Sequence, residues 1–194
     1  MILYRTPLTA LVLAAALSLS SCSSVPLAEV SAALAKTSPC CATYADINTF
    51  PLEINKRLAT TIDTSSKAFA SPVGFTYFAA FQLPAASRTI DFQAMHGDFL
   101  RLATFTDPIF VFLDREKRPL KEVRQPTLAT GRHKLFPGLY EYYFGAVLEV
   151  PSESAYVVVF AHPKSERTYR TYSENGTPWD IPASPVGSFA LIAK

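Results

Sequence analysis

Apolar residues along the chain follow the patterns of β-strands. Residues 108–114 (PIFVFLD) and 156–161 (YVVVFA) are short, nearly continuous apolar runs, which are typical of strands buried on both faces. Residues 88–95 (RTIDFQAM) alternate instead, with Ile90 and Phe92 on one face, as expected for a strand exposed on its other face. We predict further strands at residues 75–83, 99–104, 146–150 and 188–193.

The predicted strands are separated by prolines, glycines and short polar stretches rather than by long helices. This arrangement predicts an all-β fold over residues 39–194, an antiparallel β-sandwich of the jelly-roll or immunoglobulin-like kind. The polar stretch 113–133 is expected to be a loop or a displaced hairpin. Residues 22–38 are predicted to be a tether, in which Leu27, Val30 and Leu34 have a spacing that indicates one or two helical turns.

The N-terminus has the pattern of a bacterial lipoprotein signal peptide. The 12 residues 8–19 are apolar apart from a threonine and a serine, and Arg5 precedes them. This run is too short to span a membrane, which needs about 20 apolar residues, but it is typical of a signal peptide. Residues 19–22 (LSSC) match the lipobox, in which an aliphatic and two small residues precede a lipid-bearing cysteine. We therefore predict a signal peptide at residues 1–21 and lipidation of Cys22.

An ordinary secretory signal with a chance cysteine is the alternative interpretation. If Cys22 does carry several acyl chains, the anchor is stable, because each buried CH₂ contributes about 0.8 kcal/mol. The N-terminus is similar to that of enterobacterial-type lipoproteins, in which an aspartate after the cysteine implies retention in the inner membrane. Ser23 stands there instead. The resemblance therefore implies the periplasmic face of the outer membrane.

Composition narrows the function classes. The 194-residue chain is 49% hydrophobic and 18% charged, which excludes general disorder. Its formal charge is +2, and loss of Arg5 with the signal peptide leaves +1 (17 basic against 16 acidic residues). A nearly neutral chain is not expected to bind nucleic acid. Residues 114–134 nevertheless carry an excess of basic side chains, which indicates either contact with anionic lipid or lipopolysaccharide phosphates or a solvated loop.

Motifs of catalysis and cofactor binding are missing from the sequence. It contains no G-x-S-x-G nucleophile elbow, no glycine-rich phosphate loop and no His or Cys spacing typical of a metal site. We therefore expect no enzymatic activity, no cofactor and no metal.

Cys40 and Cys41 are adjacent in the sequence. Neighbouring Cα atoms lie about 3.8 Å apart, closer than the roughly 4.4–6.8 Å of most disulfides, so a bridge between them would be labile. The oxidising periplasm also makes two free thiols unusual. Three states remain open: a vicinal disulfide, two buried thiols, and intermolecular bridging or metal capture.

Residues 169–180 (YRTYSENGTPWD) contain the single tryptophan of the chain, Trp179, with Tyr169 and Tyr172 nearby. Sugars stack their CH faces on aromatic rings, while amide, carboxylate and guanidinium groups bind their hydroxyls. This composition therefore fits a carbohydrate site at Trp179, Tyr172 and Tyr169. A plain loop that packs Trp179 into the end of the sandwich is the alternative.

Several segments resemble the maltose operon periplasmic protein (MalM) family. They are residues 71–73 (SPV), 77–84 (YFAAFQLP), 107–114 (DPIFVFLD), 156–163 (YVVVFAHP) and 181–192 (IPASPVGSFALI). The resemblance covers roughly residues 39–193 and implies a periplasmic location and a link to maltose and maltodextrin uptake. It provides no catalytic or ligand residues to transfer. Unlike longer members of the family, this chain begins with a lipobox and is expected to lack their C-terminal extension.

The sequence thus predicts a non-catalytic lipoprotein anchored in the outer membrane and facing the periplasm. Its expected function is an accessory role in maltose or maltodextrin transport, with weak glucan binding. One alternative is an envelope scaffold that docks a porin or another envelope protein without binding sugar. The other is a redox-linked role for Cys40 and Cys41.

Overall fold

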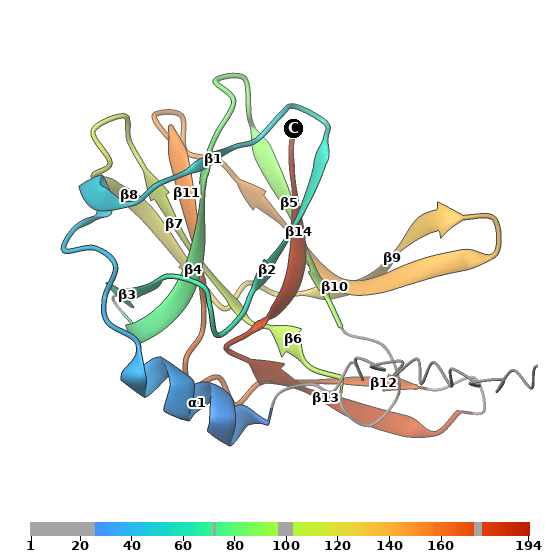
Figure 1. The fold of residues 1–194 in the computed structure, drawn as a ribbon. Coiled ribbons are helices and arrows are strands. Elements are labelled where there is room, and N and C mark those ends of the chain that lie inside the picture. The colour runs from blue at the N-terminus through green and yellow to red at the C-terminus, as the bar shows by residue number, and fades with distance from the viewer. Residues whose placement is uncertain (1–25, 72, 97–102, 173–175) are drawn as a thin grey trace, which may run out of the picture.

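The computed structural model describes residues 26–71, 73–96, 103–172 and 176–194. Within them, two β-sheets stack face to face (Figure 1). This confirms the all-β sandwich predicted from the sequence. The predicted signal peptide, the lipidation site Cys22, Ser23 and most of the predicted strand 99–104 lie outside the described residues.

The first layer is a six-stranded sheet with the order β1-β4-β11-β7-β8, in which β3 also pairs with β4. Its strands are β1 (Phe50–Pro51), β3 (Ala68–Ser71), β4 (Gly74–Gln82), β7 (Pro108–Leu113), β8 (Pro119–Arg124) and β11 (Tyr156–Ala161). Every residue of β7 is buried, as the continuous apolar run predicts. The pairs are antiparallel except for the short parallel pair β1–β4.

The second layer is a five-stranded antiparallel sheet with the order β2-β14-β5-β10-β9. Its strands are β2 (Arg57–Ile62), β5 (Thr89–Met95), β9 (Ala129–Phe136), β10 (Leu139–Glu149) and β14 (Gly187–Ala193). In β5 the apolar residues Ile90, Phe92 and Ala94 point into the sandwich and are buried, as the alternation predicts. The side chains between them therefore lie on the outer face of this sheet.

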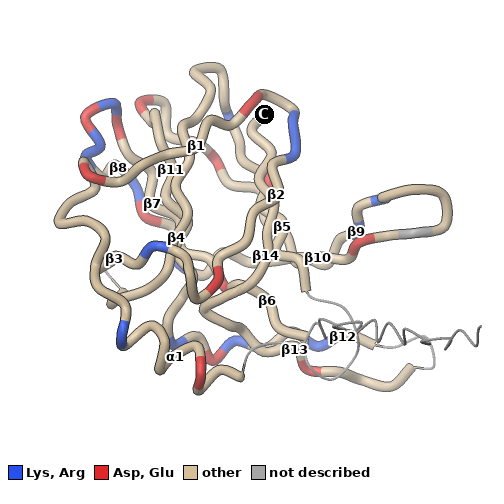
Figure 2. Tube along the Cα trace, in the orientation of Figure 1, with Lys and Arg blue, Asp and Glu red and all other residues tan. Residues whose placement is uncertain are grey.

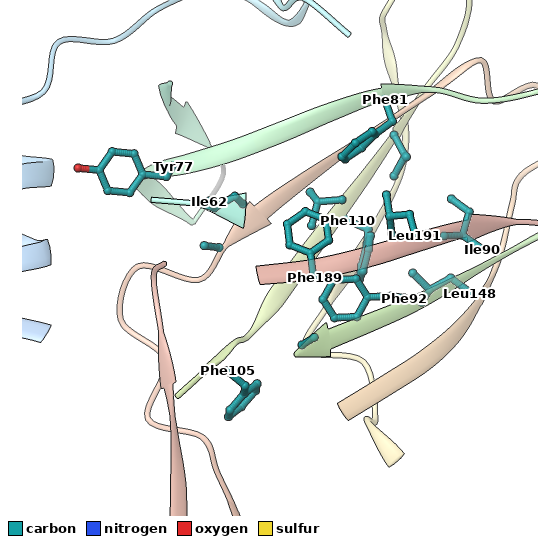
Figure 3. Close-up of a cluster of buried hydrophobic side chains, with 14 of the residues drawn as sticks. Ile62, Tyr77, Phe81, Ile90, Phe92, Phe105, Phe110, Leu148, Phe189 and Leu191 are labelled. Atoms are coloured by element: carbon teal, nitrogen blue, oxygen red, sulfur yellow. The ribbon is translucent and has the colours of Figure 1, made fainter. Parts of the chain in front are cut away.

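Phenylalanine rings join the two layers (Figure 3). The ring of Phe92 in β5 meets Phe110 of β7 edge to face, with centroids 5.2 Å apart. Phe189 of β14 lies 5.4 Å from Phe92 and 6.3 Å from Phe81 of β4. All four side chains are at most 1% exposed. Because each pair of rings contributes about 0.5–1.5 kcal/mol beyond its buried area, these contacts fix the stacking of the sheets.

A second apolar cluster covers the outer face of the six-stranded sheet. Val158 and Phe160 of β11 point to this side, where Tyr44 and Ile47 pack against the sheet. Tyr44 belongs to η1 (Tyr44–Asp46), a 3₁₀ turn. The backbone N–H and the hydroxyl of Thr43 both donate to Asp46 and hold the pKa of its carboxyl below the usual value. This cap therefore contributes stability at neutral pH, which is lost as the pH falls through that lowered pKa.

One helix precedes the sandwich in the described residues. It is α1 (Leu27–Lys36), and it confirms the helical turns predicted from the spacing of Leu27, Val30 and Leu34. Val30 and Leu34 are buried in the main core, whereas Leu27 is 55% exposed. The helix lies below the sheets in Figure 1, close to β4. The segment expected to be a mere tether thus contributes to the folded domain.

The polar stretch 113–133 forms neither one loop nor one displaced hairpin. Its first part is β8, which pairs with β7, and its last part belongs to β9, which pairs with β10.

Likewise, the segment around Trp179 is not a loop. It forms the antiparallel pair β12 (Thr168–Tyr172) and β13 (Pro178–Ser184), and β13 also pairs with β6 (Phe105–Thr106). The β12–β13 pair lies at the lower right in Figure 1.

A buried ion pair connects this small sheet to the sandwich. The Arg167 guanidinium donates to Asp107, 2.7 Å away, and the Ser165 hydroxyl donates to the other carboxylate oxygen at 2.6 Å. Asp107 is fully buried. Arg167 also donates to the carbonyl of Pro126 and to the Tyr169 hydroxyl. The network therefore joins the start of β7, the segment before β12 and the connection from β8 to β9.

We expect Asp107→Ala to lower the free energy of unfolding by about 3 kcal/mol, because it leaves Arg167 without its carboxylate. Asp180→Ala is the matched control. Asp180 pairs with Arg170 on the surface, with side chains 52% and 62% exposed, and such a pair contributes less than about 1 kcal/mol. Urea unfolding measures both changes. Equal losses in the two variants would contradict the structural role of Asp107.

Candidate functional site

The structure does not bring the three predicted sugar-binding residues into one site. In the register of β12 and β13, Thr171 lies opposite Trp179 and Tyr172 lies opposite Pro178. Side chains alternate along a strand, so Tyr169 and Trp179 point to one face of the pair and Tyr172 points to the other. Tyr172 is 67% exposed. The three rings therefore cannot stack on one ligand as a single platform.

Tyr169 is a packing residue in this structure. Its ring stacks on Phe144 with centroids 4.7 Å apart and meets Phe105 edge to face at 5.1 Å. Its hydroxyl accepts a hydrogen bond from the backbone N–H of Leu128. Trp179 is half-buried, and its indole Nε1 is buried without a hydrogen-bond partner. Tyr169 therefore packs against the sandwich, but the segment is a strand pair rather than the plain loop of the alternative interpretation.

A groove of about 310 Å³ lies on the outer face of the five-stranded sheet, between β5, β9 and β10. Its polar lining includes Asp91 and Gln93 of β5 and Thr127, which precedes β9. The floor is low because small residues occupy this stretch of β9 and β10. They are Ala129, Gly131 and Gly145.

Tyr143 is the aromatic residue of the groove. It lies directly opposite Gly131 across the β9–β10 pair and two positions before Gly145 on its own strand. A Cβ at Gly131 would come within 2.4 Å of the Tyr143 ring, and a Cβ at Gly145 within 2.8 Å. The ring therefore lies across both glycines. Glycine inside a strand marks such a close approach.

Ion pairs and hydrogen bonds fix the side chains beside the groove. Arg57 of β2 reaches across the sheet, donating from Nε to Gln93 at 3.1 Å and from Nη2 to Glu141 at 2.5 Å. The Lys194 ammonium is paired with Asp91. Gln93 is only 7% exposed. Because these polar groups are already held in place, a ligand would lose little affinity to ordering them.

The chemistry of the groove is that of polar recognition beside an aromatic surface. Amide, carboxylate and hydroxyl groups can exchange hydrogen bonds with a ligand rich in hydroxyls, and the Tyr143 ring can pack against its CH groups. The two carboxylates, Asp91 and Glu141, are each paired with a cation. The arrangement therefore fits binding of a neutral polar ligand.

Sequence reasoning did not find this site, although two signals for it are present. Glycine is scarce, with seven in the chain, yet two of the seven interrupt predicted or observed strands at positions 131 and 145. Both also stand near a run of tyrosines. The decisive fact, that Tyr143 lies opposite Gly131, depends on the strand register and is not contained in either segment alone.

Cys40 and Cys41 form a vicinal disulfide. Of the three states left open, the structure contains the Cys40–Cys41 disulfide. Cys40 is exposed and Cys41 packs against the second apolar cluster.

In the basic segment, Arg118 pairs with Asp114 and Glu116, and Arg124 pairs with Glu122. The segment does not form one continuous cationic patch, because it is divided between two hairpins (Figure 2).

No family model, curated protein or solved structure matches the chain. The resemblance to the MalM family therefore stays a hypothesis carried by the sequence segments themselves. Among the described residues, no helix has the length and apolar character needed to cross a membrane. In the same part of the chain, no three His, Cys, Asp or Glu side chains gather as metal ligands.

We expect Gly131→Ala to displace Tyr143 from the groove at little cost in stability. The added Cβ would meet only the outer part of the tyrosine side chain, which can rotate away. Gly145→Ala is the informative comparison, because its Cβ would also meet the backbone oxygen of Phe92 at 2.9 Å. It should lower the unfolding free energy by about 1–3 kcal/mol. Urea unfolding of both variants checks the difference, and similar losses would contradict this geometry.

Proposed function

We propose that this protein is a non-catalytic lipoprotein that binds glucan chains in the groove at Tyr143 and acts as an accessory to maltodextrin uptake. The observation that carries the binding is the groove itself, which has an aromatic ring, small residues in its floor and fixed polar groups beside it. The lipobox and the resemblance to the MalM family support the location and the transport role. The location proposed is the periplasmic face of the outer membrane.

The dimensions of the groove favour a short stretch of an oligosaccharide. Its volume of about 310 Å³ lies at the lower end of the roughly 300–1,000 Å³ typical of ligand sites. It lies on an open sheet face rather than in an enclosed cavity, which leaves room for a chain to continue beyond it. A shallow site of this kind suits weak binding, with a Kd of about 1 mM corresponding to about −4 kcal/mol.

Calorimetric titration with maltodextrins tests the proposal. We expect saturable binding to the wild-type protein and a loss of about tenfold in affinity, or about 1.4 kcal/mol, in Tyr143→Ala. Tyr172→Ala is the matched control, because this exposed tyrosine lies on the β12–β13 pair, away from the groove lining. It should bind like the wild type.

The opposite result, in which Tyr172→Ala weakens binding and Tyr143→Ala does not, would move the site to the β12–β13 pair. No binding of any glucan at millimolar concentration would contradict the proposal. That outcome would favour the alternative function, an envelope scaffold that docks a porin or another envelope protein.

Lipidation has a test of its own. Expressed in a bacterial host with its own leader, the protein should fractionate with membranes and show an added acyl mass on the peptide that begins at Cys22. Cys22→Ser should abolish both the added mass and the membrane fractionation, since several acyl chains are needed for stable anchoring. A wild-type protein of unmodified mass in the soluble periplasmic fraction would contradict the anchor.

A further inference from the structure

The hairpin of β9 and β10 continues beyond the sandwich. Among the described residues, β5 pairs with β10 only from Tyr143 onward, whereas β9 pairs with β10 from Leu139. Among these residues, the start of β10 (residues 139–142) is therefore paired with β9 alone, and this part of the hairpin, called the ribbon below, extends to the right of the sandwich in Figure 1. Contacts with the sandwich remain at its base, where Glu141 pairs with Arg57 of β2 and the Tyr142 ring stacks on His96.

The far end of this ribbon is apolar and exposed. Leu135 is 48% exposed and Phe136 is 60% exposed. Pro137 and Gly138 form the turn, and Gly138 has a φ of +85°, which glycine adopts without strain. Figure 2 shows no charged residue at this turn. A soluble surface seldom concentrates such large apolar side chains on a projecting tip.

Aromatic and basic side chains follow the tip in order along the ribbon. Tyr140 and Tyr142 are 36% and 53% exposed. Lys134 lies opposite Tyr140 and Arg132 lies opposite Tyr142, and the Arg132 guanidinium stacks over the Tyr140 ring at 4.6 Å. An apolar tip followed by tyrosines and cations at one level is the arrangement of a membrane interface, where tyrosines lie at the head groups and Lys and Arg meet lipid phosphates.

The charges and the backbone of the ribbon also favour a lipid surface. The acidic residue of the ribbon, Glu141, is paired with Arg57, so Arg132 and Lys134 present a net positive charge. At the turn, Pro137 has no N–H group, and Phe136 and Leu139 pair with each other across the hairpin. Insertion no deeper than the hydrated head-group region leaves the other backbone groups of the tip in contact with water.

We propose that the tip of the β9–β10 hairpin, Leu135 and Phe136, inserts into the interfacial region of an anionic phospholipid membrane. This is a contact of the folded domain itself, separate from the lipid anchor proposed at Cys22 and independent of glucan binding. The domain would then contact the membrane at two places, the lipid anchor at Cys22 and the tip of the hairpin. The groove at Tyr143 lies on the same strand as the tip, so insertion fixes the distance of the groove from the membrane.

A tryptophan placed at the tip reports this directly. In the full chain, Phe136→Trp combined with Trp179→Phe leaves one tryptophan, at the tip. Its emission is measured with vesicles of phosphatidylethanolamine and phosphatidylglycerol, and again with vesicles that contain brominated lipids. We expect a blue shift and strong quenching by the brominated lipids. Both should be weaker on neutral phosphatidylcholine vesicles and at high salt, because screening reduces the attraction of exposed charges.

The matched control is Leu120→Trp combined with Trp179→Phe. Leu120 is an exposed apolar residue of β8, 39% exposed and next to Lys121, but its strand does not project. Because both chains have the same N-terminus, anchoring through that end affects both probes equally. Quenching should be several-fold stronger at position 136 than at position 120. Near-ultraviolet circular dichroism of both chains verifies that they remain folded without Trp179.

A second pair of changes tests the charges. Adding Arg132→Gln and Lys134→Gln to the tip probe should remove its preference for phosphatidylglycerol over phosphatidylcholine. If vesicle-bound protein shows no blue shift at position 136, or no more quenching there than at position 120, the proposal is overturned. The same holds if the tip probe responds equally to neutral and anionic vesicles. Those outcomes would assign the exposed tip to contact with another protein.

Discussion

The structure depends on burying both faces of the six-stranded sheet. Its central strands, β7 and β11, are apolar on both sides, so neither side can be left in water. The five-stranded sheet covers one face with the phenylalanine core. The segment from Cys41 to Ile47 covers the other with Tyr44, and the Thr43–Asp46 cap holds this segment in its turn. The N-terminal part of the domain is therefore fixed against the sheet.

The five-stranded sheet has the opposite character. Its inner side chains complete the main core, and its outer face carries polar and small residues. Arg57 crosses this face to reach Gln93 and Glu141, and the low positions at Gly131 and Gly145 are filled from above by the Tyr143 ring. A surface that needs no covering layer, yet has its side chains fixed by one another, is suited to receive a ligand from solution.

Strand β10 contributes to the core, to the groove and to the projecting ribbon. Phe144 points into the core against Phe105, and Tyr143 points outward into the groove. At its beginning, Tyr140 and Tyr142 line the projecting ribbon. Side-chain alternation along β10 thus separates core residues from groove residues, and the first residues of the strand form the ribbon. The proposed glucan site and the proposed membrane contact are on one continuous strand, so a membrane-bound protein would present its groove close to the membrane surface.

The sequence predicted the inner strands of both sheets, β4, β11 and β7 in one and β14, β5 and part of β10 in the other, but not the site. Continuous apolar runs located β7 and β11, and alternation located β5, because burial leaves a local pattern. The edge strands β2, β8 and β9 were missed, as were the short strands β1, β3 and β6 and the β12–β13 pair, since their pairing partners rather than their own side chains determine them. Local composition placed the sugar site at Trp179, where aromatic residues gather along the chain. The strand register sends those side chains to two faces, whereas the register of the β9–β10 hairpin brings Tyr143 onto Gly131.

The central claim is that the outer face of the five-stranded sheet is the binding surface. A ¹H–¹⁵N NMR titration with a maltodextrin tests it most directly, because it locates the contact without changing any residue. We expect the shifted amide signals to gather in β5, β9 and β10 around Gln93, Gly131 and Tyr143. Shifts confined to β12 and β13 around Trp179, or no shifts at millimolar glucan, would contradict it.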